Sequence, residues 1–262
     1  MPAAILNLPD NRLYLPEVTL LAVSSVAIGP TIAALRTCLE RVRFGAVLFL
    51  TDKEQPDQCD PEIEWRSIPR IESKHAFSAF MLRDLHSHIK TSHMLCVQWD
   101  GYILDASAWS SEFLNYDYVG APWPHFDDAM SVGNGGFSLR STRLMAICAQ
   151  FRDITGESED VVICRNWRSR LESEFAMRFA PKAVARRFSF ERFPRHGGEF
   201  GFHGVFNMVD IIGAQRMTQV MKSLEIGVMA DNEHSEVLRW ALRRGRLGLA
   251  WSVARRMWRR RI

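Results

Sequence analysis

Short apolar runs alternate with helix-like segments along the first hundred residues, and this alternation limits the folds open to the chain. The apolar runs read as buried strands: VTLLAVS (18–24), AVLFLTD (46–52) and HMLCVQ (93–98). Residues 25–42 and 73–89 between them carry apolar positions at helical spacing, with Ser73 as a candidate N-cap. A less apolar run, IEWRSIP (63–69), predicts an edge strand. Strands alternating with helices predict an α/β domain with a mostly parallel sheet.

The alternation becomes less regular after residue 105. A glycine-rich loop leads into a strand at residues 132–141, a helix with an acidic first turn is predicted at 157–172, and short strands or loops follow. We find no internal repeat or linker before about residue 230. The simplest division is one domain over residues 1–232 and a tail over 233–262.

Charge is distributed unevenly between these two parts. Residues 239–262 contain nine arginines and no acidic residue, whereas the rest of the chain has 24 basic against 30 acidic residues. A mildly acidic body argues against a protein that coats nucleic acid.

The remaining composition fits a cytoplasmic protein. Five cysteines with no CxxC pair indicate reduced thiols rather than a disulfide framework or a zinc site. No apolar run is long enough for a transmembrane helix, and the first residues do not have the pattern of a signal peptide.

Polar residues follow the predicted strands where a ligand would bind. In parallel α/β sheets, ligands lie beyond the carboxyl ends of the strands. Residues at such ends are Ser24, Ser25, Thr51, Asp52, Gln98 and Asp100. Gln98 and Asp100 share a face because strand side chains alternate, and a carboxylate there is suited to hold a divalent metal on a diphosphate.

Three further motifs contain candidate functional residues. The glycines of GNGGFSLR allow positive φ and close backbone approach to a ligand, although the motif is not a P-loop. ESED (157–160) places acids at a helix start, where they serve as caps or as a general base. His203 in GFHG lies between glycines, as a metal-ligating imidazole or a structural histidine.

In this order, the motifs QWDG, YDYVGAPW (116–123), VGNGGFSLRS, ED and FGFHG resemble a glycosyltransferase-like family long catalogued as a domain of unknown function. That family is placed in the GT-A superfamily of nucleotide-diphospho-sugar transferases. The resemblance covers roughly residues 18–210. It implies a GT-A-type, Rossmann-like, mixed and mostly parallel sheet flanked by helices.

The resemblance also implies roles for individual residues. Gln98-Trp99-Asp100 occupies the place of the Asp-x-Asp motif, so Asp100 is expected to bind the metal, with His203 as a second ligand, while Gln98 removes one charge. Asp160 is the expected catalytic base, and Glu159 the second choice. The residues expected to bind the donor are Ser24, Thr51, Asp52, Lys74, Gln98, Asp100, Gly135, Gly136 and Phe137.

The implied activity is transfer of a sugar, with inversion, from a nucleotide-sugar to a hydroxyl of a glycan or lipid-linked acceptor, assisted by Mn²⁺ or Mg²⁺. Two alternatives stay open. A nucleotidyltransferase of the same fold would need a basic, glycine-rich loop after the first strand, and SSVAIGPTIAALR lacks one. A non-catalytic nucleotide-sugar or glycan-binding module is consistent with Gln98.

The basic tail is predicted to be helical, with a break near Gly245 or Gly248. From Leu247 onward, a face is expected to contain Ala250, Trp251, Ala254, Met257, Trp258 and Ile262, with arginines elsewhere. This pattern is typical of an interfacial amphipathic helix on an anionic membrane, which is the favoured interpretation; the alternative is a helix packed on the domain with a solvated basic face. The first interpretation places the protein on the inner face of a bacterial cytoplasmic membrane, without nucleic acid as a partner.

Overall fold

A computed structural model describes residues 11–153 and 156–260 of the chain. The prediction that the chain does not begin with a signal peptide concerns a segment that includes residues 1–10, which lie outside the described ranges. Ile262, the last residue of the predicted tail, also lies outside them. All five cysteines are free, and four of them are buried, as predicted for core thiols.

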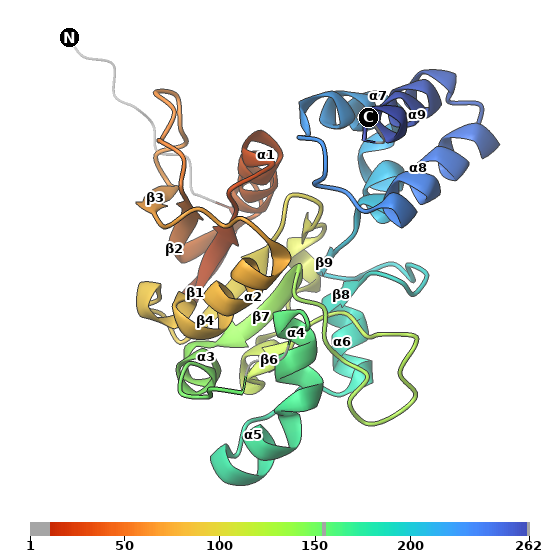
Figure 1. Cartoon of the computed structure of the whole chain (residues 1–262). Helices are drawn as coiled ribbons and strands as arrows, with labels where there is room; N and C mark the ends of the chain where they lie inside the picture. Colours follow the sequence, from red (N-terminus) through yellow and green to blue (C-terminus); the bar gives the residue numbers. More distant parts are fainter. Residues whose placement is uncertain (1–10, 154–155, 261–262) are drawn as a thin grey trace.

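A six-stranded sheet lies at the centre of the protein, in the order β3-β2-β1-β4-β7-β6 (Figure 1). Its strands are β1 (Leu13–Val23), β2 (Val42–Thr51), β3 (Glu64–Ser67), β4 (His93–Val97), β6 (Tyr118–Val119) and β7 (Phe137–Ser141). Strands β1 to β4 pair in parallel, and β7 runs antiparallel between β4 and β6. The predicted mixed, mostly parallel α/β sheet is therefore confirmed, and β3 is an edge strand as expected.

Helices cover both faces of this sheet. They are α1 (Ile28–Leu39), α2 (Lys74–Arg83), α3 (Thr142–Cys148), α4 (Glu159–Val161), α5 (Arg168–Phe175) and α6 (Lys182–Phe188). Short 3₁₀ segments span Leu85–His88, Ala106–Ala108 and Ser111–Asn115, and a π-helical turn spans Val162–Asn166. The single helix predicted over 157–172 is thus divided into α4, the π turn and α5.

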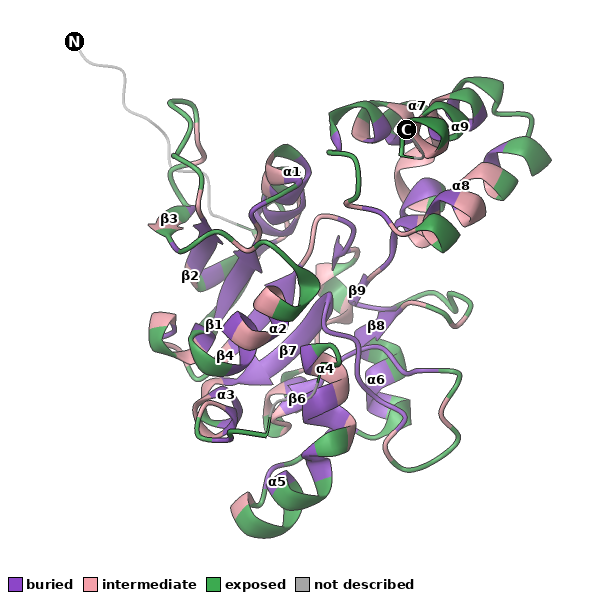
Figure 2. Cartoon of the chain, in the orientation of Figure 1, coloured by how far each residue is buried: buried purple, intermediate pink, exposed green. Residues whose placement is uncertain are grey.

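Alternating side chains of β1 supply the two hydrophobic cores between these layers. Leu20 belongs to the core that contains Leu35 of α1, whereas its neighbour Leu21 belongs to the core that contains Met81 of α2. This is the period of two that a strand buried on both faces requires. Figure 2 shows the result, with buried residues along the strands and exposed ones on the outward sides of the helices.

A second, three-stranded sheet consists of β5 (Tyr102–Ile103), β9 (Gly201–Phe202) and β8 (Ser189–Phe190), in that order. β8 and β9 are parallel, and β5 is antiparallel to β9. The start of β5 and the ends of β8 and β9 therefore lie at one edge. The sequence predicted only short strands or loops in the segments that form α6, β8 and β9.

The C-terminal part forms a group of three helices, set apart from the central sheet in Figure 1: α7 (Val205–Ser223), α8 (Asp231–Arg243) and α9 (Leu247–Arg259). The predicted boundary at 232/233 lies just inside α8, and the group begins earlier, with α7. Gly245, at φ 64°, separates α8 from α9, so a break at one of the two predicted glycines is confirmed. No helix in the described ranges combines the length and apolar composition needed to cross a bilayer.

Arg256 joins α9 to the end of α7. Its guanidinium donates hydrogen bonds of 2.7 Å to the carbonyls of Met221, Leu224 and Glu225. Carbonyls at a helix C-terminus lack partners within their own helix, so this side chain satisfies groups that would otherwise need water.

We expect Arg256→Met to lower the free energy of unfolding by about 2 kcal/mol, because hydrogen bonds to a charged group contribute about 1.5–3 kcal/mol. Methionine keeps most of the aliphatic stem, so the loss reports the hydrogen bonds. Urea unfolding followed by circular dichroism measures the change. Arg259→Met on the exposed side of the same helix is the control, and an equal loss in both variants would contradict this role of Arg256.

Candidate active site

The polar residues predicted to follow the strands do lie at one edge of the central sheet, because β1, β2 and β4 are parallel. The Ser24 amide donates to the Leu50 carbonyl at 3.0 Å and so joins the ends of β1 and β2. The hydroxyls of Ser24 and Thr51 are engaged locally, with Val26 and with the Lys53 amide at 3.2 Å. Asp52 is half-buried, and its Oδ1 has no hydrogen-bond partner in the described part of the chain.

Beyond β4, Gln98 and Asp100 meet His203. The His203 Nε2 atom lies 3.4 Å from Oδ1 of Asp100 and 3.3 Å from Oε1 of Gln98. On the other side of the ring, Nδ1 lies 3.5 Å from Oε1 of Glu191 and 3.1 Å from Nδ2 of Asn134. The predicted Gln98, Asp100 and His203 are therefore brought together, with Glu191 and Asn134 completing the cluster.

The small sheet explains how residues a hundred positions apart reach this cluster. Asp100 comes just before β5, Glu191 just after β8, and His203 just after β9. The pairing of these strands puts all three positions at the same edge. The Gly204 amide donates to the Asp100 carbonyl at 3.1 Å and closes the arrangement.

Two carboxylates control the charge of His203. Burial alone would lower the pKa of its imidazole, but Asp100 and Glu191 raise that pKa well above the ordinary value. Burial likewise opposes ionisation of Glu191, yet its hydrogen bond to His203 holds the Glu191 pKa below the usual range. Asp100 is only 4% exposed, and its Oδ1 faces Nε2 of His203.

The glycine loop packs directly on this cluster. A Cβ atom on Gly136 would lie 2.0 Å from Nε2 of His203, and one on Gly135 would lie 2.3 Å from a carboxylate oxygen of Glu159. The Gly136 carbonyl accepts a 2.9 Å hydrogen bond from the backbone amide of Gln98. Close approach is thus confirmed, but the positive φ expected of the glycines occurs instead at Asn134, at 68°. Asparagine tolerates that conformation better than most residues.

The two acids of the ESED motif point in different directions. Glu159 is buried and forms a 2.9 Å ion pair with Arg140, which is itself fully buried. Asp160 instead faces the glycine loop and accepts a 2.9 Å hydrogen bond from the Gly135 amide. Its other oxygen accepts from Ser158 at 2.6 Å and from the Val161 amide at 2.9 Å. Asp160 is therefore beside the cluster, whereas the Glu159 carboxylate lies beneath the loop.

Two other predicted donor-binding residues lie differently. The Phe137 ring is fully buried against Phe188 and Phe200, so the residue can line a pocket only with its backbone. Lys74 is exposed at the first residue of α2.

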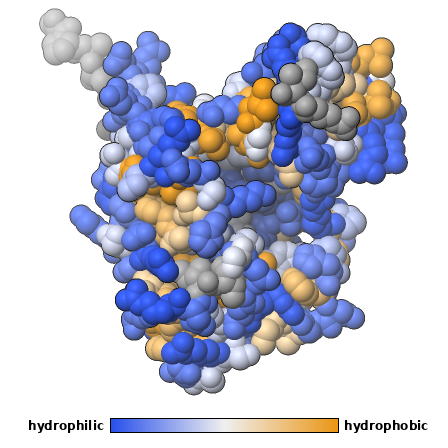
Figure 3. Space-filling view, viewed as in Figure 1, coloured by the Kyte–Doolittle hydropathy of each residue, from blue (hydrophilic) through white to orange (hydrophobic). Residues whose placement is uncertain are grey.

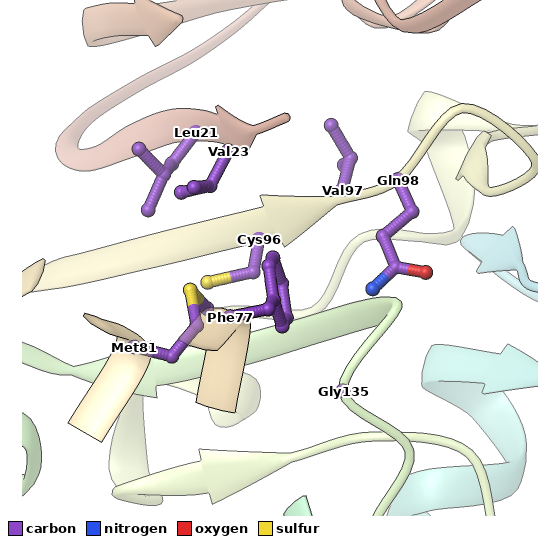
Figure 4. A pocket seen from close by; sticks show the side chains of 8 residues that line it. All are labelled: Leu21, Val23, Phe77, Met81, Cys96, Val97, Gln98 and Gly135. Carbon is purple, nitrogen blue, oxygen red and sulfur yellow. The ribbon is translucent and has the colours of Figure 1, made fainter. Parts of the chain in front are cut away.

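A small, mainly apolar pocket lies between the ends of β1 and β4, helix α2 and the glycine loop. Figure 4 shows Phe77 and Met81 of α2 below it and the Gln98 amide pointing toward the Gly135 segment at its rim. The pocket therefore lies next to the cluster and offers an apolar surface beside its polar groups.

The first turn of α8 also approaches the cluster. Burial, with the Asp100 charge as a further cause, raises the pKa of Glu233. The Glu233 carboxylate accepts a 2.7 Å hydrogen bond from the Ala230 amide and so caps α8. The charge of Glu233, at the start of the C-terminal helices, is therefore coupled to that of Asp100.

Asp100 and His203 are the residues of the cluster that could hold a divalent cation, and His203 would have to lose the proton that its two carboxylate neighbours favour. The Asp100 Oδ1 atom and the Gln98 amide oxygen both face Nε2, and Glu191 at Nδ1 is the outer carboxylate that orients a ligating histidine. No group of three or more His, Cys, Asp or Glu residues in the described ranges makes a metal site alone. The remaining ligands would have to be phosphate oxygens and water, as Mg²⁺ commonly takes them.

Sequence reasoning did not identify Glu191, Asn134 or Glu233. Glu191 follows the short apolar run FSF as Asp100 follows β4, which is the one local signal for it. Asn134 lies among the glycines of the loop, where no local pattern distinguishes it. The position of Glu233 relative to the cluster depends on how α8 packs.

We expect Glu159→Gln to destabilise the protein by about 3–5 kcal/mol, because a buried cation loses its counter-charge. Thermal and urea unfolding of the variant measure this loss. Glu174→Gln, which disrupts an exposed pair with Arg170, is the matched control and should cost less than about 1 kcal/mol. Unchanged stability of the Glu159 variant would contradict the structural role assigned to this carboxylate.

Several solved structures that the chain matches are described as glycosyltransferases. The galactosyltransferase LgtC, in complex with donor and acceptor sugar analogs, matches with a TM-score of 0.45 and 11% identity, over 83% of this chain and 99% of that one. The apo-form glycosyltransferase GlyE of Streptococcus pneumoniae matches at 0.43 and 9%, over 71% and 53%. A glycosyltransferase involved in glycosylation of the major capsid of PBCV-1 matches at 0.44 and 12%, over 71% and 91%.

None of the curated proteins matches the sequence. One family profile matches residues 62–203, which is more than half of the chain and spans every motif from QWDG to the histidine of FGFHG. The membership inferred from those motifs is thereby confirmed, and the chain belongs to the family described as "Protein of unknown function (DUF5672)".

Proposed function

We propose that the protein is a glycosyltransferase that moves a sugar from a nucleotide-diphospho-sugar to a hydroxyl of a glycan or lipid-linked acceptor, with inversion. The observation that carries this proposal is the cluster of Gln98, Asp100 and His203 beyond β4, within 3.4 Å of one another through Nε2 of His203. The cluster lies at the edge of the sheet where α/β proteins bind nucleotides. The family motifs point to the same activity.

The donor would lie across the strand ends, with its nucleoside toward β1 and β2 and its diphosphate toward Asp100. The free Oδ1 of Asp52 supports hydrogen bonding to a ribose hydroxyl, since a buried acceptor without a donor is costly. A divalent cation on Asp100 and His203, Mn²⁺ or Mg²⁺, would neutralise charge on the leaving diphosphate. Gln98 would contribute a neutral amide oxygen where a second carboxylate would add charge.

Asp160 is the proposed general base. It is separated from the cluster only by Gly135 and Gly136, which pack against Glu159 and His203. In the proposed step, an acceptor hydroxyl gives its proton to Asp160, and its oxygen bonds to the anomeric carbon. The bond from that carbon to the phosphate oxygen breaks, and the electron pair leaves with the nucleoside diphosphate.

One observation favours a second candidate, a nucleotide-sugar or glycan-binding module without turnover. Both oxygens of Asp160 already accept hydrogen bonds, from Gly135, Ser158 and Val161. A carboxylate held in this way also suits a purely structural clamp of the glycine loop. Such a module would bind the donor at the same strand ends and release no nucleoside diphosphate.

Release of nucleoside phosphate from a panel of UDP-, GDP-, dTDP- and CMP-sugars tests the proposal. Each donor is incubated with the protein and cell-envelope extract, in the presence of Mn²⁺, Mg²⁺ or EDTA. We expect cation-dependent release from one donor and strong loss in Asp100→Asn. Donor binding without release, for every acceptor and metal, would favour the binding module, and no binding at all would contradict both candidates.

We expect Asp160→Asn to lower kcat by about 10²- to 10⁴-fold with little change in donor affinity, because general-base catalysis contributes that much to rate. Steady-state kinetics with the identified donor and calorimetric donor titration separate the two effects. Glu174→Gln on α5 is the control for expression and handling. Loss of donor affinity or of folding in step with kcat would instead identify Asp160 as a clamp of the loop.

A further inference from the structure

Helix α9 has two hydrophobic faces, only one of which is used by the fold. Leu249, Ala250 and Val253 are buried in the core shared with α7 and α8. The opposite face keeps Leu247 71%, Trp251 65% and Trp258 64% exposed. The sequence grouped residues of both faces into one stripe, so the structure corrects its membership: Ala250 and Met257 turn toward the fold, and Leu249 and Val253 join them.

The exposed residues form a continuous line along α9. Leu247, Trp251, Ala254 and Trp258 are spaced four, three and four residues apart, which keeps them on one side of a helix. We call these four residues the outer stripe. Figure 3 shows hydrophobic side chains at the outer edge of the C-terminal helices, beside hydrophilic ones.

Exposed apolar side chains of this size are concentrated here. The described residues include seven exposed large hydrophobic side chains: Tyr14, Val26, Ile226, Leu242, Leu247, Trp251 and Trp258. Three of them are in the outer stripe, and Leu242 is at the end of α8. A cluster of exposed apolar residues rimmed by polar ones marks an interaction surface, whereas single exposed residues do not.

Arginines beside the outer stripe determine the kind of partner. Arg255 lies 5.3 Å over the Trp251 ring, and Arg259 follows one turn later; both are exposed, and neither forms an ion pair within residues 156–260. Arg256 and Arg260, by contrast, are bonded to backbone carbonyls of the α7–α8 region. No acidic residue occurs anywhere in 239–262.

This combination fits the surface of an anionic bilayer better than other partners. Trp and Arg side chains on one helix suit the interface, where indole rings lie at headgroup level and guanidinium groups meet lipid phosphates. A second copy of the chain would bring two arginine-rimmed faces together, and like charges oppose that contact. The acidic body of the protein, with 24 basic against 30 acidic residues outside the tail, disfavours a nucleic acid.

We propose that the outer stripe docks the protein on an anionic lipid bilayer, with α9 lying in the plane of the interface. Trp251, Trp258 and Leu247 enter the headgroup and upper acyl region, while Arg255 and Arg259 bind lipid phosphates. The proposal concerns binding alone and does not depend on the proposed sugar transfer.

Co-sedimentation of the full-length protein with lipid vesicles tests it. Vesicles of phosphatidylcholine alone are compared with vesicles that also contain phosphatidylglycerol, at low and high NaCl. We expect binding to the anionic vesicles, weakening with salt, and a blue shift of tryptophan fluorescence on binding. The Trp251→Ser/Trp258→Ser variant should bind about tenfold or more weakly, since affinity of an interfacial helix follows its buried apolar area.

Two controls make the result specific. Tyr14→Ser removes an exposed aromatic side chain on β1, far along the chain from the outer stripe, and should bind as the unmodified protein does. Arg255→Gln/Arg259→Gln should reduce binding to anionic vesicles only, with Arg170→Gln on α5 as its matched control. Melting temperatures of all variants are compared first, because only folded variants are informative.

Several outcomes would overturn the proposal. Vesicle binding that is equal in the double tryptophan variant, or equal with and without phosphatidylglycerol, would contradict it. The proposal would also be contradicted if vesicle binding were absent and analytical ultracentrifugation showed a dimer that the double tryptophan variant abolishes. Binding to single-stranded RNA in place of vesicles would contradict it as well. The vesicle assay contains neither donor nor acceptor, so failure of docking and failure of the proposed transfer are distinguishable.

Discussion

The buried ion pair between Arg140 and Glu159 is the interaction on which the candidate site depends. Both side chains are almost completely removed from water, so each charge requires the other. Arg140 also donates to the Ser138 hydroxyl at 3.0 Å and to the Gly135 carbonyl at 3.3 Å. Through these bonds a side chain of β7 fixes the glycine loop that precedes β7, and it fixes the start of α4 as well.

Fixing that loop also fixes the groups around it. Asp160, the residue after Glu159, accepts a hydrogen bond from the backbone amide of Gly135. The Gly136 carbonyl accepts one from the backbone amide of Gln98. Gly136 leaves room for the His203 ring and for no side chain. A buried charge pair that lends little net stability therefore has a clear use here, since it sets the position of a loop that contacts Gln98 and His203.

The sequence was informative wherever one local rule decided the outcome. The apolar runs predicted β1, β2 and β4, and the parallel pairing that follows from them put Gln98 and Asp100 at a shared edge. It was misleading where partners lie far apart in the chain. Nothing local distinguishes Glu159, which is paired with Arg140, from Asp160, which faces the loop. Glu191 depends on a two-residue strand, β8, too short for a periodic pattern to show.

The tail shows the same limit in another form. Helical spacing alone placed Ala250 and Trp251 in one apolar face, because adjacent residues lie only about 100° apart around a helix. Packing against α7 decides between them: it buries Ala250 with Leu249 and Val253 and leaves Trp251 outside. Patterns identify an amphipathic helix, but only its neighbours determine which half of a broad apolar face remains free.

The outer stripe and the candidate site are joined by short segments of the chain. Only Gly204 separates His203 from α7, and Glu233 in the first turn of α8 is charge-coupled to Asp100. Helix α8 has 13 residues, so it spans about 20 Å at 1.5 Å per residue. A bilayer on the outer stripe would therefore lie within a few tens of ångströms of Asp100. An acceptor hydroxyl on a lipid-linked glycan would have to extend only a few sugar units from the headgroups to reach the site, whereas a freely diffusing acceptor would gain nothing from the docking.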